Sequence, residues 1–281
     1  MIDEEPRPGL TTPARVLTYD DGRAREIVDD LATEEPLEIR VVAGSQTRSL
    51  AVTMRTPGND FDLAAGFLLS EGVIRRREEI AGISYCIDPQ VDAEQRYNIV
   101  NVRLAVDSLP ALERLERHFT MSSACGVCGK ANIEALQTRA ERIEDEVRIS
   151  LSLVAQLPDK MRQAQRVFES TGGLHAAALF DASGELLSLR EDVGRHNAVD
   201  KIIGWAVLSG RLPLRGCVLL VSGRASYELV QKSIVAGIPI LCAVSAPSSL
   251  AVDLARNFGM TLLGFVRGSR ANVYAGRERI T

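Results

Sequence analysis

Residues 217–244 read CVLLVSGRASYELVQKSIVAGIPILCAV, which contains one complete strand, helix and strand pattern. The apolar runs at 217–222 and 239–244 are typical of buried strands, and residues 226–236 between them have helical spacing. Two strands joined through a helix lie parallel in one sheet, and the helix packs on that sheet. This stretch therefore predicts a layered α/β fold.

The same alternation continues on both sides of this stretch. Strands at 174–180 and 186–190 flank a polar turn and predict a hairpin. The other expected elements are helices at 195–209 and 247–258 and strands at 261–266 and 272–275. We expect residues 171–281 to form one α/β domain with parallel crossovers.

The N-terminal part of the chain has a different pattern. It predicts strands at 37–44, 48–54, 80–88 and 97–104 and a helix at 61–72 that ends at a glycine. These elements would form a smaller α+β domain over residues 15–110. Residues 1–14 are rich in proline, threonine and charge, so we expect a mobile segment there and structure from near Val16.

Residues 111–170 are expected to connect the two domains. Helical residues at 111–119 lead into a loop, and an amphipathic helix at about 152–169 follows it. The chain has 281 residues and 46% hydrophobic content, which is sufficient to give both domains a core.

Composition limits the partners and the location of the protein. The formal net charge of -4 argues against a general nucleic-acid surface, and the basic run 75–77 is interpreted as a solvated helix end. No run of about 18 uncharged apolar residues exists, and the first residues lack the regions of a signal peptide. We therefore expect a cytoplasmic protein with no nucleic-acid and no membrane partner.

Two of the five cysteines are expected to be reactive. Cys125 and Cys128 lie in a loop of small residues just before a run of strong helix formers. The start of a helix and the nearby Lys130 would both stabilise a thiolate. The other three cysteines lie in predicted strands and are expected to be buried as small apolar residues: Cys86, Cys217 and Cys242.

Several chemistries are possible for the reactive pair. A structural zinc site would need further ligands, and the zinc deaminase motif is missing because Ala124 precedes Cys125 and Ala176 follows His175. No permanent metal is therefore expected. A thioredoxin-like dithiol normally follows a strand, whereas helical residues precede this loop. The pattern favours sulfur transfer, in which a thiolate accepts a sulfur atom as a persulfide and passes it on.

Three predicted loops follow strands of the C-terminal sheet, where ligands of open α/β sheets bind. Their hydroxyls, glycines, arginines and one aromatic ring suit a large phosphorylated ligand. The alternative is that the serines are ordinary helix caps, since neither a Walker motif nor G-x-G-x-x-G is present. The candidate ligand-binding residues are Ser222, Arg224, Ser226, Ser248, Phe265, Val266, Arg267, Gly268, Ser269 and Arg270.

The segment 191–197 places two carboxylates, Arg195 and His196 at the start of a predicted helix. It is interpreted either as an acid/base site or as a polar helix start whose charges satisfy one another. His175 lies in an apolar strand and is expected to be a hydrogen-bonded structural residue. His118 is expected on a helix surface.

Four runs of the sequence are distinctive: 125–129 (CGVCG), 191–201 (EDVGRHNAVDK), 222–232 (SGRASYELVQK) and 246–252 (APSSLAV). They closely resemble the FdhD family, the formate dehydrogenase accessory sulfurtransferases. The likeness extends over nearly the whole chain, from about residue 15 onward.

The resemblance implies a cytoplasmic, homodimeric carrier that receives sulfur from a cysteine desulfurase. The sulfur would pass to the molybdenum of bis(molybdopterin guanine dinucleotide) before this cofactor enters formate dehydrogenase. Cys125 corresponds to the family's persulfide carrier, and residues 265–270 correspond to its guanine dinucleotide segment. The resemblance also implies a cytidine deaminase-like α/β/α layering in the C-terminal half. The role of Cys128 stays open between resolving thiol, loop support and second carrier.

The resulting hypothesis is that Cys125 carries the sulfur and that the three loops hold the cofactor. One alternative is a chaperone that binds and delivers the cofactor without carrying sulfur. A second is a dithiol oxidoreductase that cycles a Cys125–Cys128 disulfide.

Overall fold

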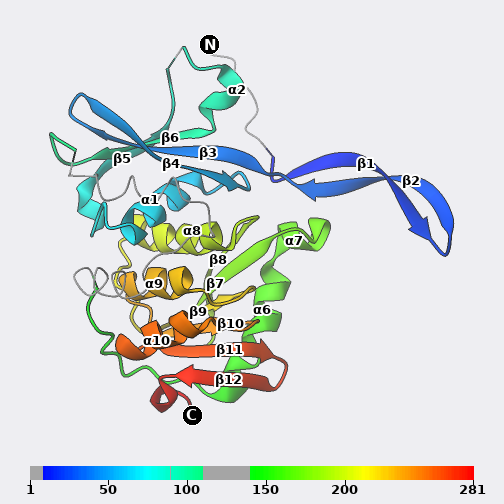
Figure 1. The fold of residues 1–281 in the computed structure, drawn as a ribbon, viewed down its shortest axis with the longest axis vertical. Coiled ribbons are helices and arrows are strands. Elements are labelled where there is room, and N and C mark those ends of the chain that lie inside the picture. Colours follow the sequence, from blue (N-terminus) through cyan, green and yellow to red (C-terminus); the bar gives the residue numbers. More distant parts are fainter. Residues whose placement is uncertain (1–8, 89, 110–139) are drawn as a thin grey trace.

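The computed structural model describes residues 9–88, 90–109 and 140–281 (Figure 1). These residues form a two-stranded, a four-stranded and a six-stranded sheet. The α/β class predicted from the sequence is confirmed. Within the described ranges, no helix is long and apolar enough to cross a membrane.

The six-stranded sheet is mixed, with strand order β12-β11-β10-β9-β7-β8. Its central strands β9, β10 and β11 are parallel, as the sequence predicts. Hairpins complete both sides, because β7 runs antiparallel to β8 and β9, and β12 runs antiparallel to β11. The bounds are β7 His175–Asp181, β8 Leu186–Asp192, β9 Cys217–Val221, β10 Ile240–Ala243, β11 Thr261–Arg267 and β12 Arg270–Ala275.

Helices cover both faces of this sheet. Alternate strand residues point to opposite faces, so Leu219 and Leu241 belong to one core and Leu220 and Cys242 to the other. The first core contains α8 (Arg195–Leu208), α9 (Tyr227–Val235) and α10 (Ser249–Asn257). The second contains residues of α5 (Leu151–Val154) and α6 (Leu157–Ala164).

The single helix predicted at about 152–169 is wrong, because three short helices occupy this region. They are α5, α6 and α7 (Arg166–Thr171). Pro158 lies in the first turn of α6, where its missing N–H costs no helical hydrogen bond. In the interior of one long helix the same proline would remove a hydrogen bond and clash with the preceding turn, so α5 and α6 are separate helices. Gln165 is extended (φ -80°, ψ 90°) between α6 and α7, which separates these two helices.

The N-terminal domain has the four strands and the helix that the sequence predicts. Its sheet has the order β4-β3-β6-β5, and α1 ends in front of Gly72, which has a φ of 74°. The bounds are β3 Glu35–Ala43, β4 Gln46–Arg55, α1 Asp60–Ser70, β5 Ile80–Tyr85 and β6 Ile99–Leu104, with short helices at Arg77–Glu79 and Ala93–Arg96.

The four-stranded and six-stranded sheets are joined where α1 crosses α8. Gly66 and Gly204 face the partner helix there, and a Cβ atom on either would overlap backbone atoms of the other helix. One hydrophobic core therefore continues from the four-stranded sheet through both helices to the six-stranded sheet. This close crossing fixes how the N-terminal domain lies on the α8 side of the larger sheet.

A long hairpin precedes the four-stranded sheet and projects from the body of the molecule (Figure 1). It consists of β1 (Thr11–Asp20) and β2 (Arg23–Ala32), joined by Asp21 and Gly22 with positive φ angles. The sequence predicts structure only from near Val16, so the observed strand begins five residues earlier. The sequence of this hairpin does not alternate regularly between apolar and polar residues, because neither of its faces is buried.

Candidate functional site

The predicted reactive cysteines lie outside the described residues. Cys125, Cys128 and His118 all fall within 110–139, so their roles stay predictions. All of the residues predicted to contact a phosphorylated ligand are described.

Backbone hydrogen bonds join the three predicted loops side by side. The N–H of Ser245 donates to the carbonyl of Gly223 (3.3 Å), and that of Ser248 to the carbonyl of Ala225 (3.0 Å). The third loop joins them through Phe265, whose N–H donates to the carbonyl of Ser245 (3.1 Å). The loops therefore form one surface at the carboxyl edge of the parallel strands, where α9 and α10 begin.

Three of the four predicted serines have structural roles. Ser226 and Ser248 cap α9 and α10, because each Oγ accepts the N–H three residues later, at 3.5 Å and 3.3 Å. Ser222 accepts the N–H of Ala176 at 2.9 Å. The alternative interpretation as caps and turn residues therefore describes these contacts. Each hydroxyl retains hydrogen-bonding capacity for a ligand.

The aromatic residue of the third loop is held in an uncommon conformation. Phe265 has a φ of 54°, in the left-handed region that non-glycine residues rarely adopt. The guanidinium of Arg270 lies 5.6 Å from the centre of its ring. Val266 is fully buried in the core beneath this loop, so it serves packing and is not placed to contact a ligand.

Several cationic groups at this edge are exposed. Arg224 and Arg267 both reach the surface, and the Nε of Arg267 donates to the carbonyl of Val244 at 3.0 Å. Gly268 makes the turn between β11 and β12 with a φ of 51°, and Ser269 is exposed beside it. The predicted loop residues thus supply positive charge to one edge of the sheet.

His175 joins these loops, a position that the sequence did not reveal. Because β7 runs antiparallel to β9, its first residue lies beside the end of β9, with Nδ1 3.5 Å from the Oγ of Ser222. Burial, together with the charges of Arg195 and His196, lowers the pKa of His175. The imidazole is therefore favoured in its neutral form, which accepts or donates one hydrogen bond at each nitrogen.

Arg195 lies beside the same surface. Its Cδ is 3.8 Å from the position that a Cβ on Gly223 would take, and His175 is 3.6 Å from that position. The buried Nε of Arg195 has no hydrogen-bond partner among the described residues. The sequence could predict the cluster of His175, Arg195 and Gly223 only if it showed that β7 runs antiparallel to β9.

The two carboxylates of segment 191–197 hold the fold. Glu191 accepts the N–H groups of Val167 (3.1 Å) and Phe168 (2.8 Å) at the start of α7. Asp192 is fully buried and lies 2.7 Å from the Nζ of Lys201. Both carboxylates therefore have partners outside segment 191–197, and the contacts of the described residues do not show the segment's charges satisfying one another.

His196 pairs with residues of α9. Its Nε2 lies 3.3 Å from the Oγ of Ser226 and 3.7 Å from the Oε2 of Glu228. The hydrogen bond to His196, helped by Ser226 and opposed by burial, lowers the pKa of Glu228 to about 2. Glu228 is therefore a stable anion. It holds the imidazole of His196 where the first turns of α8 and α9 lie side by side.

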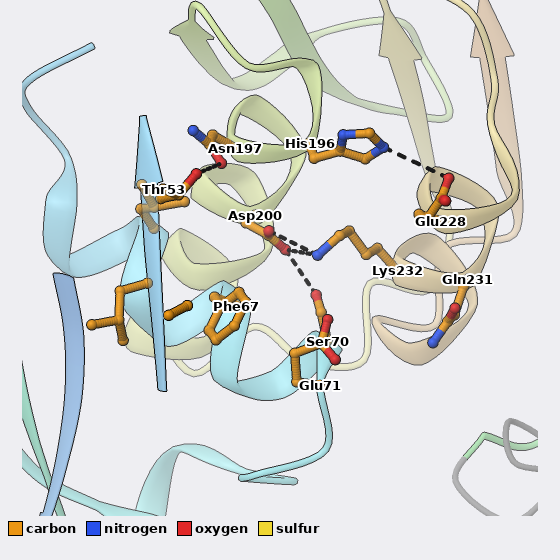
Figure 2. Close-up of a pocket in the computed structure, with 13 residues that line it drawn as sticks. Thr53, Phe67, Ser70, Glu71, His196, Asn197, Asp200, Glu228, Gln231 and Lys232 are labelled. Carbon is orange, nitrogen blue, oxygen red and sulfur yellow. Dashed lines mark hydrogen bonds and ion pairs between the residues drawn. The ribbon is translucent and has the colours of Figure 1, made fainter. Parts of the chain in front are cut away.

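A cavity of about 270 Å³ lies beside His196 and is lined by residues of β3, β4, α1, α8 and α9 (Figure 2). Its polar side holds Asp200, which accepts from Lys232 at 2.8 and 2.9 Å and from Ser70 at 2.8 Å. Phe67 from α1 lies on its apolar side. The buried ion pair satisfies its own charges, and Glu71 and Gln231 also line the cavity.

The remaining cysteines are packing residues, as the sequence predicts. Cys86, Cys217 and Cys242 are unbridged and buried. Burial raises the pKa of Cys242 to about 12 and also raises the pKa of Cys217. Across the described ranges, no three His, Cys, Asp or Glu residues are grouped as metal ligands.

Comparison with known sequences gives consistent matches over nearly the full chain. The model of the FdhD/NarQ family matches residues 32–281. The chain is 54% identical over 274 residues to the sulfur carrier protein FdhD of Streptomyces avermitilis, which covers 96% of each chain. It is 44% identical over 268 residues to the protein of the same name from Sulfurisphaera tokodaii, covering 95% of this chain and 98% of that one.

A solved structure also resembles the whole chain. It is the crystal structure of a candidate formate dehydrogenase accessory protein from Desulfotalea psychrophila, with a TM-score of 0.74 and 26% sequence identity. The match covers 97% of this chain and 100% of that chain.

Proposed function

Since this chain belongs to the FdhD/NarQ family, we propose that it is a sulfur carrier in the maturation of formate dehydrogenase. The thiolate of Cys125 attacks the terminal sulfur of a persulfide on a cysteine desulfurase. The sulfur–sulfur bond of that persulfide breaks, the desulfurase cysteine leaves as a thiolate, and Cys125 becomes the persulfide. In the second step the bond between the two sulfurs of the Cys125 persulfide would break, Cys125 would leave as a thiolate, and the outer sulfur would pass to the substrate, the molybdenum of bis(molybdopterin guanine dinucleotide), with a reduced molybdenum supplying the two electrons.

The observation that supports cofactor binding is the joined edge of three loops. The starts of α9 and α10, each nine residues long, present N–H groups and positive dipole ends at this edge. Arg224, Arg267 and Arg270 add exposed positive charge beside them. Such an arrangement suits the pyrophosphate groups of a guanine dinucleotide, and Phe265 offers a ring next to them.

The neutral His175 and the unpaired Nε of Arg195 extend this binding surface toward α8. We include both residues in the proposed site, where they would donate hydrogen bonds to ligand oxygens. We also propose that the C-terminal layers are deaminase-like without a zinc site, which the helices on both faces of the mixed sheet support.

Mass spectrometry after incubation with a desulfurase and cysteine tests the carrier role. The wild-type protein should gain one sulfur atom on the peptide that contains Cys125, and Cys125→Ala should gain none there. Cys86→Ala is the control, because it removes a buried thiol of the N-terminal domain and should leave loading unchanged.

Each other outcome supports a different function. A wild-type protein that binds the cofactor but gains no sulfur is the chaperone alternative. A Cys125–Cys128 disulfide that turns over with dithiol substrates is the oxidoreductase alternative. Full formate dehydrogenase maturation by Cys125→Ala would also refute the proposed carrier.

A further inference from the structure

The cavity beside His196 has an apolar lining and a polar one (Figure 2). Ile39 and Ala51 from the four-stranded sheet and Leu63 and Phe67 from α1 supply the apolar lining. The volume of about 270 Å³ is close to the lower limit of about 300 Å³ for small-molecule sites in proteins. The cavity therefore has room for one ring system and not for a whole dinucleotide.

A buried ion pair fixes one part of the polar lining. Asp200 and Lys232 are 3% and 8% exposed, and Asp200 accepts from Ser70 as well as from Lys232. An ammonium group has three N–H donors, and among the described residues Lys232 donates to the two oxygens of Asp200 alone. The third N–H of Lys232 is therefore left for a ligand, on a nitrogen whose position the ion pair holds.

Two more residues of α9 line the same cavity. Glu228 and Gln231 are three positions apart, so they are neighbours on one face of the helix. His196 contacts one oxygen of Glu228, and the carboxylate retains further acceptor sites. Within the described residues the amide of Gln231 has no hydrogen bond. The α9 face thus presents a carboxylate, an amide and one ammonium N–H to the cavity.

These groups complement the edge of an aminopyrimidinone ring, which carries an amino group, a ring N–H and a carbonyl oxygen in a row. A carboxylate accepts from the amino group and the ring N–H together, and amide or ammonium N–H groups donate to the carbonyl oxygen. The apolar lining suits the flat faces of such a ring, since it includes the aromatic ring of Phe67. Phosphate groups are disfavoured in the cavity because the carboxylates of Asp200 and Glu228 line it.

The cavity lies next to the proposed phosphate-binding edge. Ser226 caps α9 at that edge, and its Oγ lies 3.3 Å from the Nε2 of His196, which lines the cavity. A phosphate at the start of α9 and a ring in the cavity would be separated by the side chain of His196. One extended ligand can therefore occupy both positions.

We propose that this cavity is a pterin-binding subsite, with Glu228 and Gln231 as specificity-determining residues for the ring. The inference rests on the proposed function, in which the ligand is bis(molybdopterin guanine dinucleotide). Guanine and pterin both carry the aminopyrimidinone edge, and a pyrophosphate joins the guanosine to the pterin-bearing part. With guanine assigned to residues 265–270 and the pyrophosphate to the start of α9, the pterin is the ring that enters the cavity.

Neopterin, a soluble and fluorescent pterin, is the probe for this subsite. Titration with the full chain should raise its fluorescence anisotropy to saturation at protein concentrations below about 0.5 mM. Gln231→Leu replaces the amide by an apolar group and should raise the dissociation constant of neopterin about tenfold, as expected for a lost hydrogen bond. Gln163→Leu, the same exchange at an exposed residue of α6, is the matched control and should leave the constant unchanged.

A second variant tests the cavity without removing a polar group. Ala51→Leu adds apolar atoms to the lining and should abolish neopterin binding by filling the space. The affinity for guanosine diphosphate should stay within about threefold of wild type in Ala51→Leu and Gln231→Leu, which also shows that both variants are folded.

Competition distinguishes the two rings that share this edge. Saturating guanosine diphosphate should leave the dissociation constant of neopterin within about threefold of its value without nucleotide. Displacement of neopterin by guanosine diphosphate, or a loss of nucleotide affinity in Gln231→Leu, would assign the cavity to guanine and overturn the proposal. The absence of neopterin binding, or equal losses in Gln231→Leu and Gln163→Leu, would overturn it as well.

The outcome is separable from that of the sulfur-loading experiment. Neopterin binding that depends on Gln231, in a protein whose Cys125 gains no sulfur, would refute the carrier role and leave the subsite standing. Sulfur loading on Cys125 in a protein that binds guanosine diphosphate and no neopterin would refute the subsite alone.

Discussion

Side chains of segment 191–201 divide between holding the fold and facing the loops. The Nζ of Lys201 lies 2.7 Å from Asp192 and donates to the carbonyl of Thr56 at 2.9 Å, so this buried group ties α8 to the N-terminal domain. A buried charge of this kind is costly to leave without its partner. Arg195 and His196 instead lie toward the starts of α8 and α9. One polar segment of the sequence therefore contains residues that hold the fold and residues that face the loops.

Glu228 should influence stability at acid pH. Its pKa is about 2 in the folded chain against an ordinary value of 4.5, so the carboxylate stabilises the fold above about pH 4.5. This contribution is lost as the pH falls toward about 2. The side chain is 60% exposed, so solvent should limit the contribution to less than about 1 kcal/mol.

Urea unfolding of Glu228→Gln between pH 2 and pH 6 measures this contribution. The variant should show a flatter pH dependence of the free energy of unfolding than the wild type. Glu169→Gln, at an exposed carboxyl of α7, serves as the control. Coincident curves for Glu228→Gln and the wild type would contradict the assigned interaction with His196.

The helices and strands are assembled around the crossing of α1 and α8. Gly66 and Gly204 lie where the two backbones approach each other. Because glycine has no Cβ atom, the helices can pack closely there. This contact connects the core of the four-stranded sheet to that of the six-stranded sheet. The site depends on it, because α8 also carries Arg195 and His196.

Adding one methyl group at this crossing should separate the helices. Gly66→Ala gains helix propensity, yet its Cβ would overlap the backbone of α8, so a net destabilisation of at least about 2 kcal/mol is expected. Gly82→Ala, where a Cβ meets nothing within 4 Å, should change stability far less. Thermal and urea unfolding compare the two variants. Equal stability for both would show that the helices can move apart at no cost.

For the molecule as a whole, the direction of the parallel strands decides where the proposed ligand surface lies. β9, β10 and β11 end at the same edge, and their loops are hydrogen bonded to one another there. Exposed arginines gather at this edge, but the opposite edge of the sheet also has them, for example Arg215 just before β9. Composition alone therefore does not distinguish the two edges.

Guanosine diphosphate can serve as a probe for the proposed edge. Arg224→Ala removes an exposed charge from the loop after β9 and should weaken binding about tenfold, as expected for a lost charge-assisted contact. Arg215→Ala removes the same charge from the opposite edge and should leave the affinity unchanged. Isothermal titration calorimetry at constant salt measures both. Equal losses would indicate a general charge effect instead of a site.

Much of the fold was predictable because burial imposes a period on the sequence. The strands and helices after residue 171 were found from apolar runs and turn residues, and the N-terminal sheet from alternation. The helix at about 152–169 was wrong because Pro158 and the extended Gln165 interrupt a pattern that is otherwise helical. The start of β1 is not predictable from apolar periodicity, because a hairpin with no buried face needs no regular apolar pattern.

The local sequence by itself determined the element types, the turn positions and the family membership, because these depend on neighbouring residues and on motif spacing. Only the tertiary structure decided which of the polar residues meet. His175 lies at the edge formed by the three predicted loops because β7 runs antiparallel to β9, and Val266 does not contribute to that surface because its side chain is buried in the core. The positions of these two side chains depend on contacts between segments that are distant in the sequence, and a local sequence pattern does not reveal such contacts.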